Sequence, residues 1–206
     1  MSTFNNRPIY LITDDSKFNF NTLFEKVKQS IEGGTSIVQL REKHSNSLDF
    51  YKHALKIKEL CKKYNVLFII NDRLDIAQAV DADGVHLGQS DLPLNISRDI
   101  LGDGKIIGAS ARTLEDALKA QNQGADYLGV GAVFSTKTKK DAKHITKADF
   151  LNIRNNISIP IYAIGGININ NAIDIKAYKA NGIAISSAIL NASDSKEAAT
   201  YFKDLF

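Results

Sequence analysis

Leu128-Gly-Val-Gly-Ala-Val-Phe-Ser-Thr-Lys-Thr-Lys-Lys-Asp141 joins a short apolar run to a polar loop. The apolar run, residues 127–130, is typical of a buried strand, and Gly129 and Gly131 lie at and just past its end. The loop then supplies hydroxyl and ammonium groups from Ser135, Thr136, Lys137, Thr138, Lys139 and Lys140. Small residues let backbone N–H groups approach an anion, and lysines add positive charge. The stretch predicts a phosphate-binding loop after a strand, with a solvated basic turn as the alternative.

Apolar runs of the same kind recur along the whole chain and alternate with helical patterns. The predicted strands cover residues 8–13, 36–40, 66–70, 84–87, 105–109, 126–130, 159–164 and 182–185. The predicted helices lie near residues 23–31, 48–64, 74–80, 92–101, 113–123, 145–155, 168–180 and 193–206. Thr113, Thr146 or Lys147, and Asn168 are expected at the starts of the fifth, sixth and seventh helices.

Strands that are apolar on both faces indicate a parallel sheet covered by helices. Eight strand–helix units favour an α/β fold with one closed (β/α)₈ TIM barrel domain over residues 1–206. An open doubly wound sheet is the alternative. No Gly-x-Gly-x-x-Gly motif follows the first strand, which argues against a dinucleotide-binding version of that sheet.

Composition narrows the function classes. The chain has 206 residues, 44% of them hydrophobic, with 26 basic against 23 acidic side chains. A net charge of +3 is too close to neutral for a nucleic-acid-binding protein, which would carry a basic face. No apolar run approaches the roughly 18 residues that span a membrane, and no signal peptide is recognised at the start. Cys61 is the only cysteine and is expected to be packed. A cytoplasmic protein is expected, with a homo-oligomer left open.

The ends of the predicted strands carry polar side chains where a barrel of this kind holds its active site. After the second strand, alternation places Gln39, Arg41 and Lys43 on one side, a set that suits a pyrophosphate and a polar ring. The alternative is an ion pair of Arg41 with Glu42 or Asp72. Asn71 and Asp72 follow the third strand.

Asp72 and Asp91 follow neighbouring predicted strands and could together bind Mg²⁺, which takes a few carboxylates plus substrate phosphate oxygens. Alternatively, each caps the helix that follows it. Ser110 follows the fifth strand, where it could donate to an anion or be a plain loop serine. His86 is expected to be packed, and His44 and His53 to be solvated.

Two further loops complete a set of anion-compatible sites. Ile164-Gly-Gly-Ile167 follows the seventh strand, and Ile185-Ser-Ser-Ala-Ile189 follows the eighth. Paired loops after strands seven and eight that open onto a short helix form a recurrent phosphate site of the TIM barrel. Two phosphate-binding regions and a metal imply two phosphorylated small-molecule substrates, with no nucleic acid or membrane partner.

Taken together, these motifs resemble the thiamine phosphate synthase family over nearly the whole chain. The matching stretches are Gln39-Leu-Arg-Glu-Lys43, Ile70-Asn-Asp-Arg73, Asp83-Gly-Val-His-Leu-Gly-Gln-Ser-Asp91, Gly131 to Asp141 and Ile164-Gly-Gly-Ile167. The resemblance implies a (β/α)₈ barrel that joins a 4-amino-5-hydroxymethyl-2-methylpyrimidine diphosphate to a thiazole phosphate. The expected products are thiamine phosphate and pyrophosphate, formed through a pyrimidine-methyl cation.

The resemblance also assigns roles. It implies that the pyrimidine diphosphate is held by Gln39, Arg41, Lys43, Asn71, Ser110 and Lys139, of which Arg41, Lys43 and Lys139 stabilise the departing diphosphate. Asp72 and Asp91 are implied as Mg²⁺ ligands. The implied thiazole phosphate ligands are Thr136, Thr138, Gly166, Ser186 and Ser187, although which serine contacts phosphate stays open. Ala132 departs from the proline that the family usually has after Gly131.

Two other functions stay open at the level of sequence. A thiazole tautomerase of the same superfamily resembles the synthase, but it would need neither paired Asp72 and Asp91 nor the Thr-x-Thr-Lys run that begins at Thr136. A non-catalytic sensor of phosphorylated ligands is the more distant alternative, against which the intact pair of metal-ligand candidates argues.

Overall fold

Eight parallel strands close into a barrel in the computed structural model, which describes residues 3–135 and 144–206. Each strand pairs with the next along the chain, and the first pairs with the last. The strands are β1 Ile9–Ile12, β2 Ile37–Leu40, β3 Leu67–Asn71, β4 Gly84–Leu87, β5 Ile106–Ala111, β6 Tyr127–Gly131, β7 Ile161–Ile164 and β8 Gly182–Ile185. The predicted TIM barrel is confirmed, and the open sheet is excluded because β1 and β8 are hydrogen-bonded neighbours.

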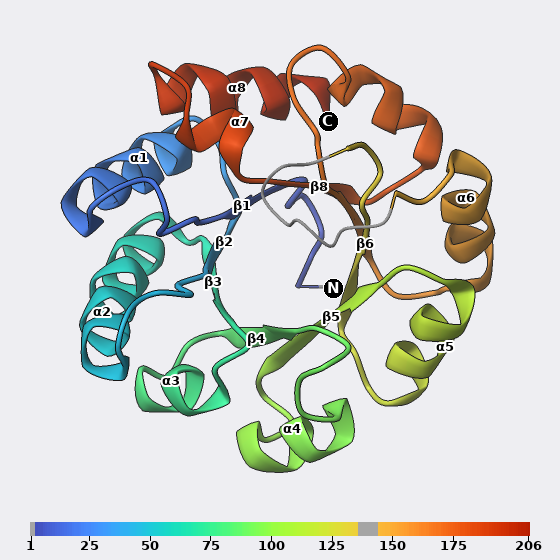
Figure 1. Cartoon of the computed structure of the whole chain (residues 1–206), viewed down its shortest axis with the longest axis horizontal. Coiled ribbons are helices and arrows are strands. Elements are labelled where there is room, and N and C mark those ends of the chain that lie inside the picture. Colours follow the sequence, from blue (N-terminus) through green and yellow to red (C-terminus); the bar gives the residue numbers. More distant parts are fainter. Residues whose placement is uncertain (1–2, 136–143) are drawn as a thin grey trace.

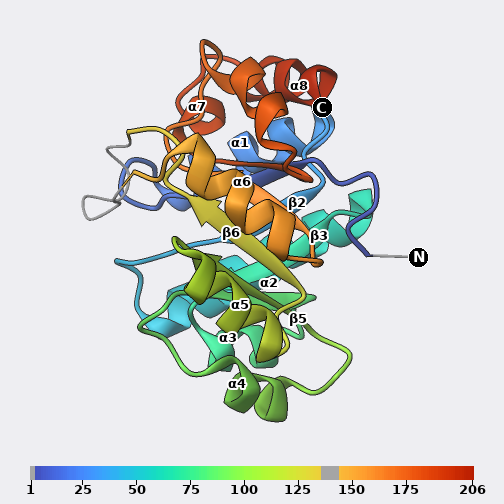
Figure 2. The same cartoon turned by 90° about the vertical axis from the view of Figure 1, so that its right-hand side faces the viewer.

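Helices form a ring around the barrel (Figure 1). They are α1 Phe20–Glu32, α2 Ser47–Tyr64, α3 Leu74–Ala79, α4 Leu94–Leu101, α5 Leu114–Asn122, α6 Lys147–Asn156, the 3-10 helix η1 Ala172–Tyr178, α7 Ser187–Leu190 and α8 Ser195–Leu205. Thr113 and Thr146 cap α5 and α6, as the sequence predicts. The side view shows the helices packed against the outside of the strands (Figure 2).

The predicted seventh helix, residues 168–180, is wrong at its start and in its type. Asn168 does not cap it: its side-chain oxygen accepts from Asn170 N, and Asn171 accepts from Asn168 N. Both asparagines also donate to Gly166 O. These side chains give the backbone local partners that compete with helical hydrogen bonds. The chain therefore turns first, and only a 3-10 helix follows, from Ala172.

Two apolar clusters lie on opposite faces of the sheet. The larger lies between strands and helices and includes Cys61, which is buried beside Phe50, Ala54 and Ile57 as predicted. The smaller lies inside the barrel and contains Tyr10, Ile37, Ile69, Tyr127, Tyr162 and Ala184. Gly108 makes room for the smaller cluster, because a Cβ at Gly108 would overlap the ring of Tyr127.

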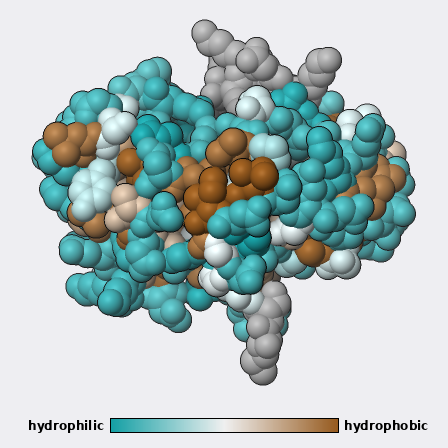
Figure 3. All heavy atoms as spheres, turned by 90° about the horizontal axis from the view of Figure 1, so that it is seen from below, coloured by the Kyte–Doolittle hydropathy of each residue, from teal (hydrophilic) through white to brown (hydrophobic). Residues whose placement is uncertain are grey.

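The outer surface is largely hydrophilic with local apolar areas. Figure 3 looks onto the side that carries α4 in Figure 1, and apolar atoms gather near the middle of that face. Exposed apolar side chains on and just before α4 are Leu92, Ile96 and Ile100. None of the helices in the described part of the chain combines the length and apolarity that crossing a membrane requires.

Candidate active site

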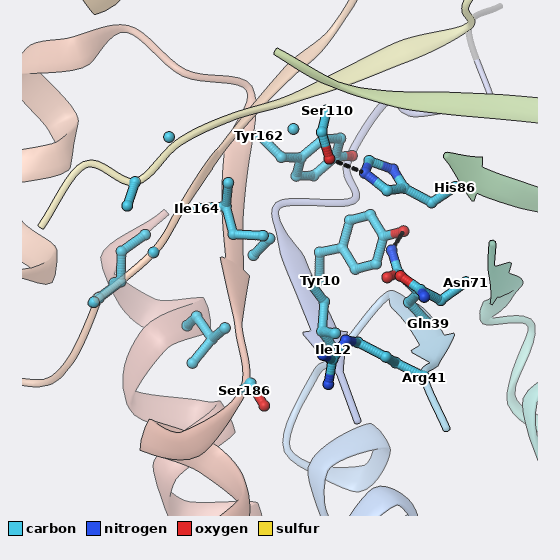
Figure 4. A pocket seen from close by; sticks show the side chains of 18 of the residues that line it. Tyr10, Ile12, Gln39, Arg41, Asn71, His86, Ser110, Tyr162, Ile164 and Ser186 are labelled. Atoms are coloured by element: carbon cyan, nitrogen blue, oxygen red, sulfur yellow. Dashed lines mark hydrogen bonds between the residues drawn. The ribbon is translucent and has the colours of Figure 1, made fainter. Parts of the chain in front are cut away.

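A pocket lies inside the barrel and is lined by side chains or backbone from all eight strands. Alternation along the strands explains which residues reach it, because every second side chain points inward. Figure 4 shows Gln39, Arg41 and Asn71 together on one side of this pocket, with Ser186 on another. The predicted substrate-binding residues that line it are Gln39, Arg41, Asn71, Ser110, Gly166, Ser186 and Ser187.

The β2 end of the pocket presents an amide and a guanidinium. Gln39 is buried, and its Nε2 donates to the hydroxyl of Tyr10 at 2.7 Å. Arg41 forms no ion pair with any described residue, because the carboxylates proposed as its partners are taken: Glu42 bonds His53, and Asp72 bonds Lys43. The ion-pair alternative for Arg41 is therefore wrong, and its charge faces the pocket.

Lys43 does not join Gln39 and Arg41 in lining the pocket, contrary to the alternation expected for it. β2 ends at Leu40, so strand alternation does not extend to residue 43. Instead, Lys43 Nζ forms a hydrogen-bonded ion pair with Asp72 Oδ2, just beyond Asn71, which does line the pocket. The charges of Lys43 and Asp72 thus lie beside the pocket, whereas that of Arg41 faces it.

Asp72 and Asp91 lie close enough to affect each other's ionisation. Burial opposes ionisation of Asp72, but the hydrogen bond and charge of Lys43 outweigh it, so the pKa of Asp72 lies below its ordinary value. Burial raises the pKa of Asp91, and the negative charge of Asp72 adds to the rise, although Gly88 N donates to Asp91 Oδ2 at 2.6 Å. Two carboxylates therefore share one polar environment.

Neither aspartate caps a helix. The residue at the start of α3 is Arg73 and that at the start of α4 is Pro93, and neither helix has a side-chain cap. Asp72 has a φ of 61°, a left-handed conformation that is uncommon outside glycine and that clusters at functional sites. The capping alternative is excluded, and a different reason for two adjacent carboxylates is needed.

The two carboxylates fit a small divalent cation. Their mutual repulsion would be relieved by a shared positive ion, and oxygen ligands are those that Mg²⁺ prefers. Within the described ranges, no three or more His, Cys, Asp or Glu side chains gather as a metal site. Asp72 and Asp91 could therefore supply only part of a coordination shell, which suits an ion that keeps waters and takes substrate phosphate oxygens.

The β7 and β8 ends of the pocket present backbone and hydroxyl groups. Gly166 has a φ of +69°, and a Cβ there would meet the carbonyl oxygen of Ser135 and lie within 2.8 Å of Phe134 Cβ. The Ser186 hydroxyl is buried and has no hydrogen-bond partner in the described part of the chain. Ser187 begins the predicted short helix, α7, and is exposed. An unpartnered buried hydroxyl is costly unless a ligand satisfies it.

Part of the predicted site falls on residues 136–143. Thr136, Thr138 and Lys139 lie outside the described residues. The segment before them is described: Ala132, which follows a cis peptide bond, lines the pocket, and its carbonyl oxygen accepts from Ile145 N at 2.9 Å.

Sequence reasoning missed four aromatic residues that line the pocket. Three are tyrosines of the inner cluster: Tyr10, Tyr127 and Tyr162. The fourth, His86, is buried as predicted, yet it also lines the pocket and bonds Ser110 through Nε2 at 3.0 Å. Strand alternation could have identified them, because the pattern that places Gln39 inward also applies to these strands.

The solvated state expected for His53 is wrong. The His53 ring is half-buried and stacks on Phe20, with 3.7 Å between ring centroids, and its Nδ1 bonds Glu42 at 2.8 Å. His44 is exposed, as expected. Neither histidine lines the pocket.

Comparison with known proteins identifies the family of this chain. A family model described as thiamine monophosphate synthase matches residues 9–189. A thiamine-phosphate synthase of Fusobacterium nucleatum is 54% identical over 190 residues, which cover 92% of each chain. One from Clostridium botulinum is 57% identical over 159 residues, covering 77% of this chain and 75% of the other.

A solved structure extends the likeness to three dimensions. The thiamine phosphate pyrophosphorylase of Pyrococcus furiosus superposes with a TM-score of 0.90 at 38% identity, over 98% of this chain and 96% of the other. Because the family model spans most of the barrel and the relatives match at such identity over most of their length, this chain belongs to the thiamine monophosphate synthase family.

Proposed function

We propose that this chain joins a hydroxymethylpyrimidine diphosphate to a thiazole phosphate, giving thiamine phosphate and pyrophosphate. The observation that carries the proposal is the pocket with two unlike polar sides. One side has guanidinium and amide groups and a nearby pair of carboxylates, and the other has glycine backbone and serine hydroxyls. A pocket of this kind suits two substrates that carry different phosphate groups.

The β2–β5 side suits the pyrimidine diphosphate. The Arg41 guanidinium, not paired with a described carboxylate, can bond phosphate oxygens in a fixed fork. Gln39 and Asn71 supply amides for a polar ring, and Ser110 supplies a hydroxyl. Lys43, held by Asp72, adds positive charge beside the pocket, and Lys139 is assigned to the same group by family resemblance.

Asp72 and Asp91 would hold a Mg²⁺ ion beside this diphosphate. When bound, the ion supplies positive charge to the diphosphate oxygens and so favours departure of pyrophosphate. The residues themselves contribute the carboxylate oxygens and, through the ion pair of Asp72 with Lys43, a fixed orientation of one ligand. The donor set therefore accounts for the charged groups that no helix cap explains.

The β7–β8 side suits the thiazole phosphate. Gly166 lets the backbone approach closely, and the buried Ser186 hydroxyl needs a partner that a phosphate oxygen can provide. Family resemblance adds Thr136 and Thr138 to this group, with Ser187 beside Ser186. No described lysine, arginine or carboxylate on these strands lines the pocket.

The reaction needs no protein nucleophile. The bond between the pyrimidine methylene carbon and the diphosphate oxygen breaks, and both electrons leave with pyrophosphate. The thiazole nitrogen then gives its lone pair to the methylene cation, which forms the new carbon–nitrogen bond. Arg41 and Lys43 stabilise the growing negative charge, the electrostatic contribution that usually dominates such transfers. The pocket holds the two reacting atoms next to each other.

The test is direct synthesis. Purified chain is mixed with both substrates and Mg²⁺, and thiamine phosphate and pyrophosphate are measured, with either substrate or Mg²⁺ omitted as controls. Formation of both products only in the complete mixture is expected. Isomerisation of a thiazole phosphate alone would instead indicate a tautomerase, and binding without turnover would indicate a sensor.

A further inference from the structure

A chain of hydrogen-bonded side chains crosses the barrel interior and links Gln39 on β2 with Ser110 on β5. Gln39 Nε2 donates to the Tyr10 hydroxyl at 2.7 Å, and that hydroxyl lies 2.6 Å from the hydroxyl of Tyr127. The Tyr127 hydroxyl lies 3.0 Å from His86 Nδ1, and His86 Nε2 lies 3.0 Å from Ser110 Oγ. Both end groups, Gln39 and Ser110, line the pocket and are shown in Figure 4.

The donor at one end sets the direction of every bond in this chain. Because Gln39 donates to Tyr10, the Tyr10 hydroxyl is left to donate its own hydrogen to Tyr127. Tyr127 then donates to His86 Nδ1, which must be the nitrogen without a hydrogen. A neutral imidazole with a bare Nδ1 carries its hydrogen on Nε2, and Nε2 therefore donates to Ser110. The Ser110 hydroxyl hydrogen remains for the pocket.

Burial favours this one-way order. Tyr10 is 1% exposed and Tyr127 is 0% exposed, so their hydroxyls cannot exchange a wrong partner for water. Burial also raises the pKa of both tyrosines, and each keeps its hydroxyl hydrogen as a donor. Reversing one hydrogen bond alone would place two hydrogens or two lone pairs face to face at another bond of the series from Gln39 to Ser110.

We propose that Tyr10 and Tyr127 are positioning residues that set which hydrogen-bonding groups Gln39 and Ser110 present to the substrate. Gln39 presents its carbonyl oxygen as an acceptor, and Ser110 presents its hydroxyl hydrogen as a donor. The identity of the substrate groups rests on the proposed function. The amino group of the pyrimidine is a donor for Gln39, and a diphosphate oxygen is an acceptor for Ser110.

Tyr162 offers a matched control within the same aromatic cluster. Its ring packs edge-on against Tyr10 and Tyr127, with centroids 5.4 and 5.8 Å away. Its hydroxyl, however, donates to the carbonyl oxygen of Arg7 at 2.9 Å and takes no part in the hydrogen-bond chain. Tyr162→Phe therefore removes the same atom from the same cluster without touching the link between Gln39 and Ser110.

The first measurement is the tautomer of His86, determined by ¹⁵N NMR on the full chain without substrate. The parent chain is expected to carry the hydrogen on Nε2. Tyr127→Phe removes the donor to Nδ1 and is expected to give a mixture of tautomers, whereas Tyr162→Phe keeps the parental one. A parent with the hydrogen on Nδ1, or an unchanged tautomer in Tyr127→Phe, would overturn the proposal.

The second measurement separates the substrates. Tyr10→Phe and Tyr127→Phe are expected to raise the KM for the pyrimidine diphosphate about tenfold, the effect of one lost hydrogen bond, and to leave the KM for the thiazole phosphate within about twofold. Equal rises for both substrates would contradict the proposal. Failure of the parent chain to form thiamine phosphate would refute the proposed function and leave the tautomer result to stand by itself.

Discussion

The two sides of the pocket differ in the kind of group that they offer a phosphate. Beside strands β2 to β4, side chains provide formal charge, and the charges constrain one another through the ion pair of Lys43 with Asp72 and the proximity of Asp91. At strands β7 and β8, the described lining carries no formal charge and consists of glycine backbone, apolar side chains, Tyr162 and two serines. The difference suits a metal-assisted leaving diphosphate on one side and a bound, unreacting phosphate on the other.

The sides also differ in how they use left-handed backbone. On the charged side a non-glycine residue, Asp72, has a φ of 61°, and the proposed metal site uses its carboxylate. On the neutral side Gly165 and Gly166 have φ values of +99° and +69°, and the absence of a side chain is what the site needs. Substitutions should therefore act through charge on one side and through steric contact on the other.

The largest effect is expected for Asp72→Asn, which removes charge from the carboxylate pair. Asparagine also tolerates a left-handed φ, and the lost ion pair is partly exposed, so the melting temperature should change little. Turnover should fall about 100-fold or more. Steady-state kinetics over a range of Mg²⁺ concentrations check this prediction. Equal turnover with EDTA and with Mg²⁺ would refute a role for the metal.

A smaller effect, caused by steric contact and not by loss of charge, is expected for Gly166→Ala. The new Cβ would press on Ser135 O and strain the positive φ, which should move the loop away from the thiazole phosphate. The KM for the thiazole phosphate should rise about tenfold, which is the effect expected when one hydrogen bond is lost. The KM for the pyrimidine diphosphate is the control, and a rise confined to that substrate would reverse the assignment of the two sides.

The smallest effect distinguishes two adjacent serines. Ser186 has a buried hydroxyl without a described partner, whereas Ser187 is exposed at the start of α7. Ser186→Ala should raise the KM for the thiazole phosphate about five-fold, and Ser187→Ala less than about two-fold. Measuring both variants under the same conditions settles which serine contacts phosphate, because the reverse order would assign the contact to Ser187.

Much of the fold follows from local patterns, and the misses have local causes. Apolar strands and their spacing predict the barrel because parallel strands buried on both faces need helices on the outside. The segment after Asn168 is wrong because asparagine side chains compete with helical hydrogen bonds. That competition depends on which backbone groups a turn brings near the side chains, and the sequence pattern does not contain this.

The sequence predicts several of the described residues that line the pocket, but not the contacts they make. Alternation placed Gln39 and Arg41 correctly but was extended to Lys43, beyond the end of β2. Tyr10 and Tyr127 were interpreted as ordinary strand residues, because a tyrosine in an apolar run gives no sign of where its hydroxyl points. Their partners come from strands distant in sequence, so only the closed barrel brings the hydrogen-bond chain together.

The most direct test of the two-sided pocket is a cross-comparison of binding by calorimetry. Each substrate is titrated separately into the parent chain, Arg41→Ala and Ser186→Ala, with Mg²⁺ present. Arg41→Ala should weaken binding of the pyrimidine diphosphate about tenfold or more and leave binding of the thiazole phosphate nearly unaffected. Ser186→Ala should weaken binding of the thiazole phosphate about five-fold and leave binding of the pyrimidine diphosphate nearly unaffected. Equal loss of affinity for both substrates in either variant would contradict a pocket divided between two phosphorylated substrates. Loss of affinity for the other substrate in each variant would contradict the assignment of the two sides.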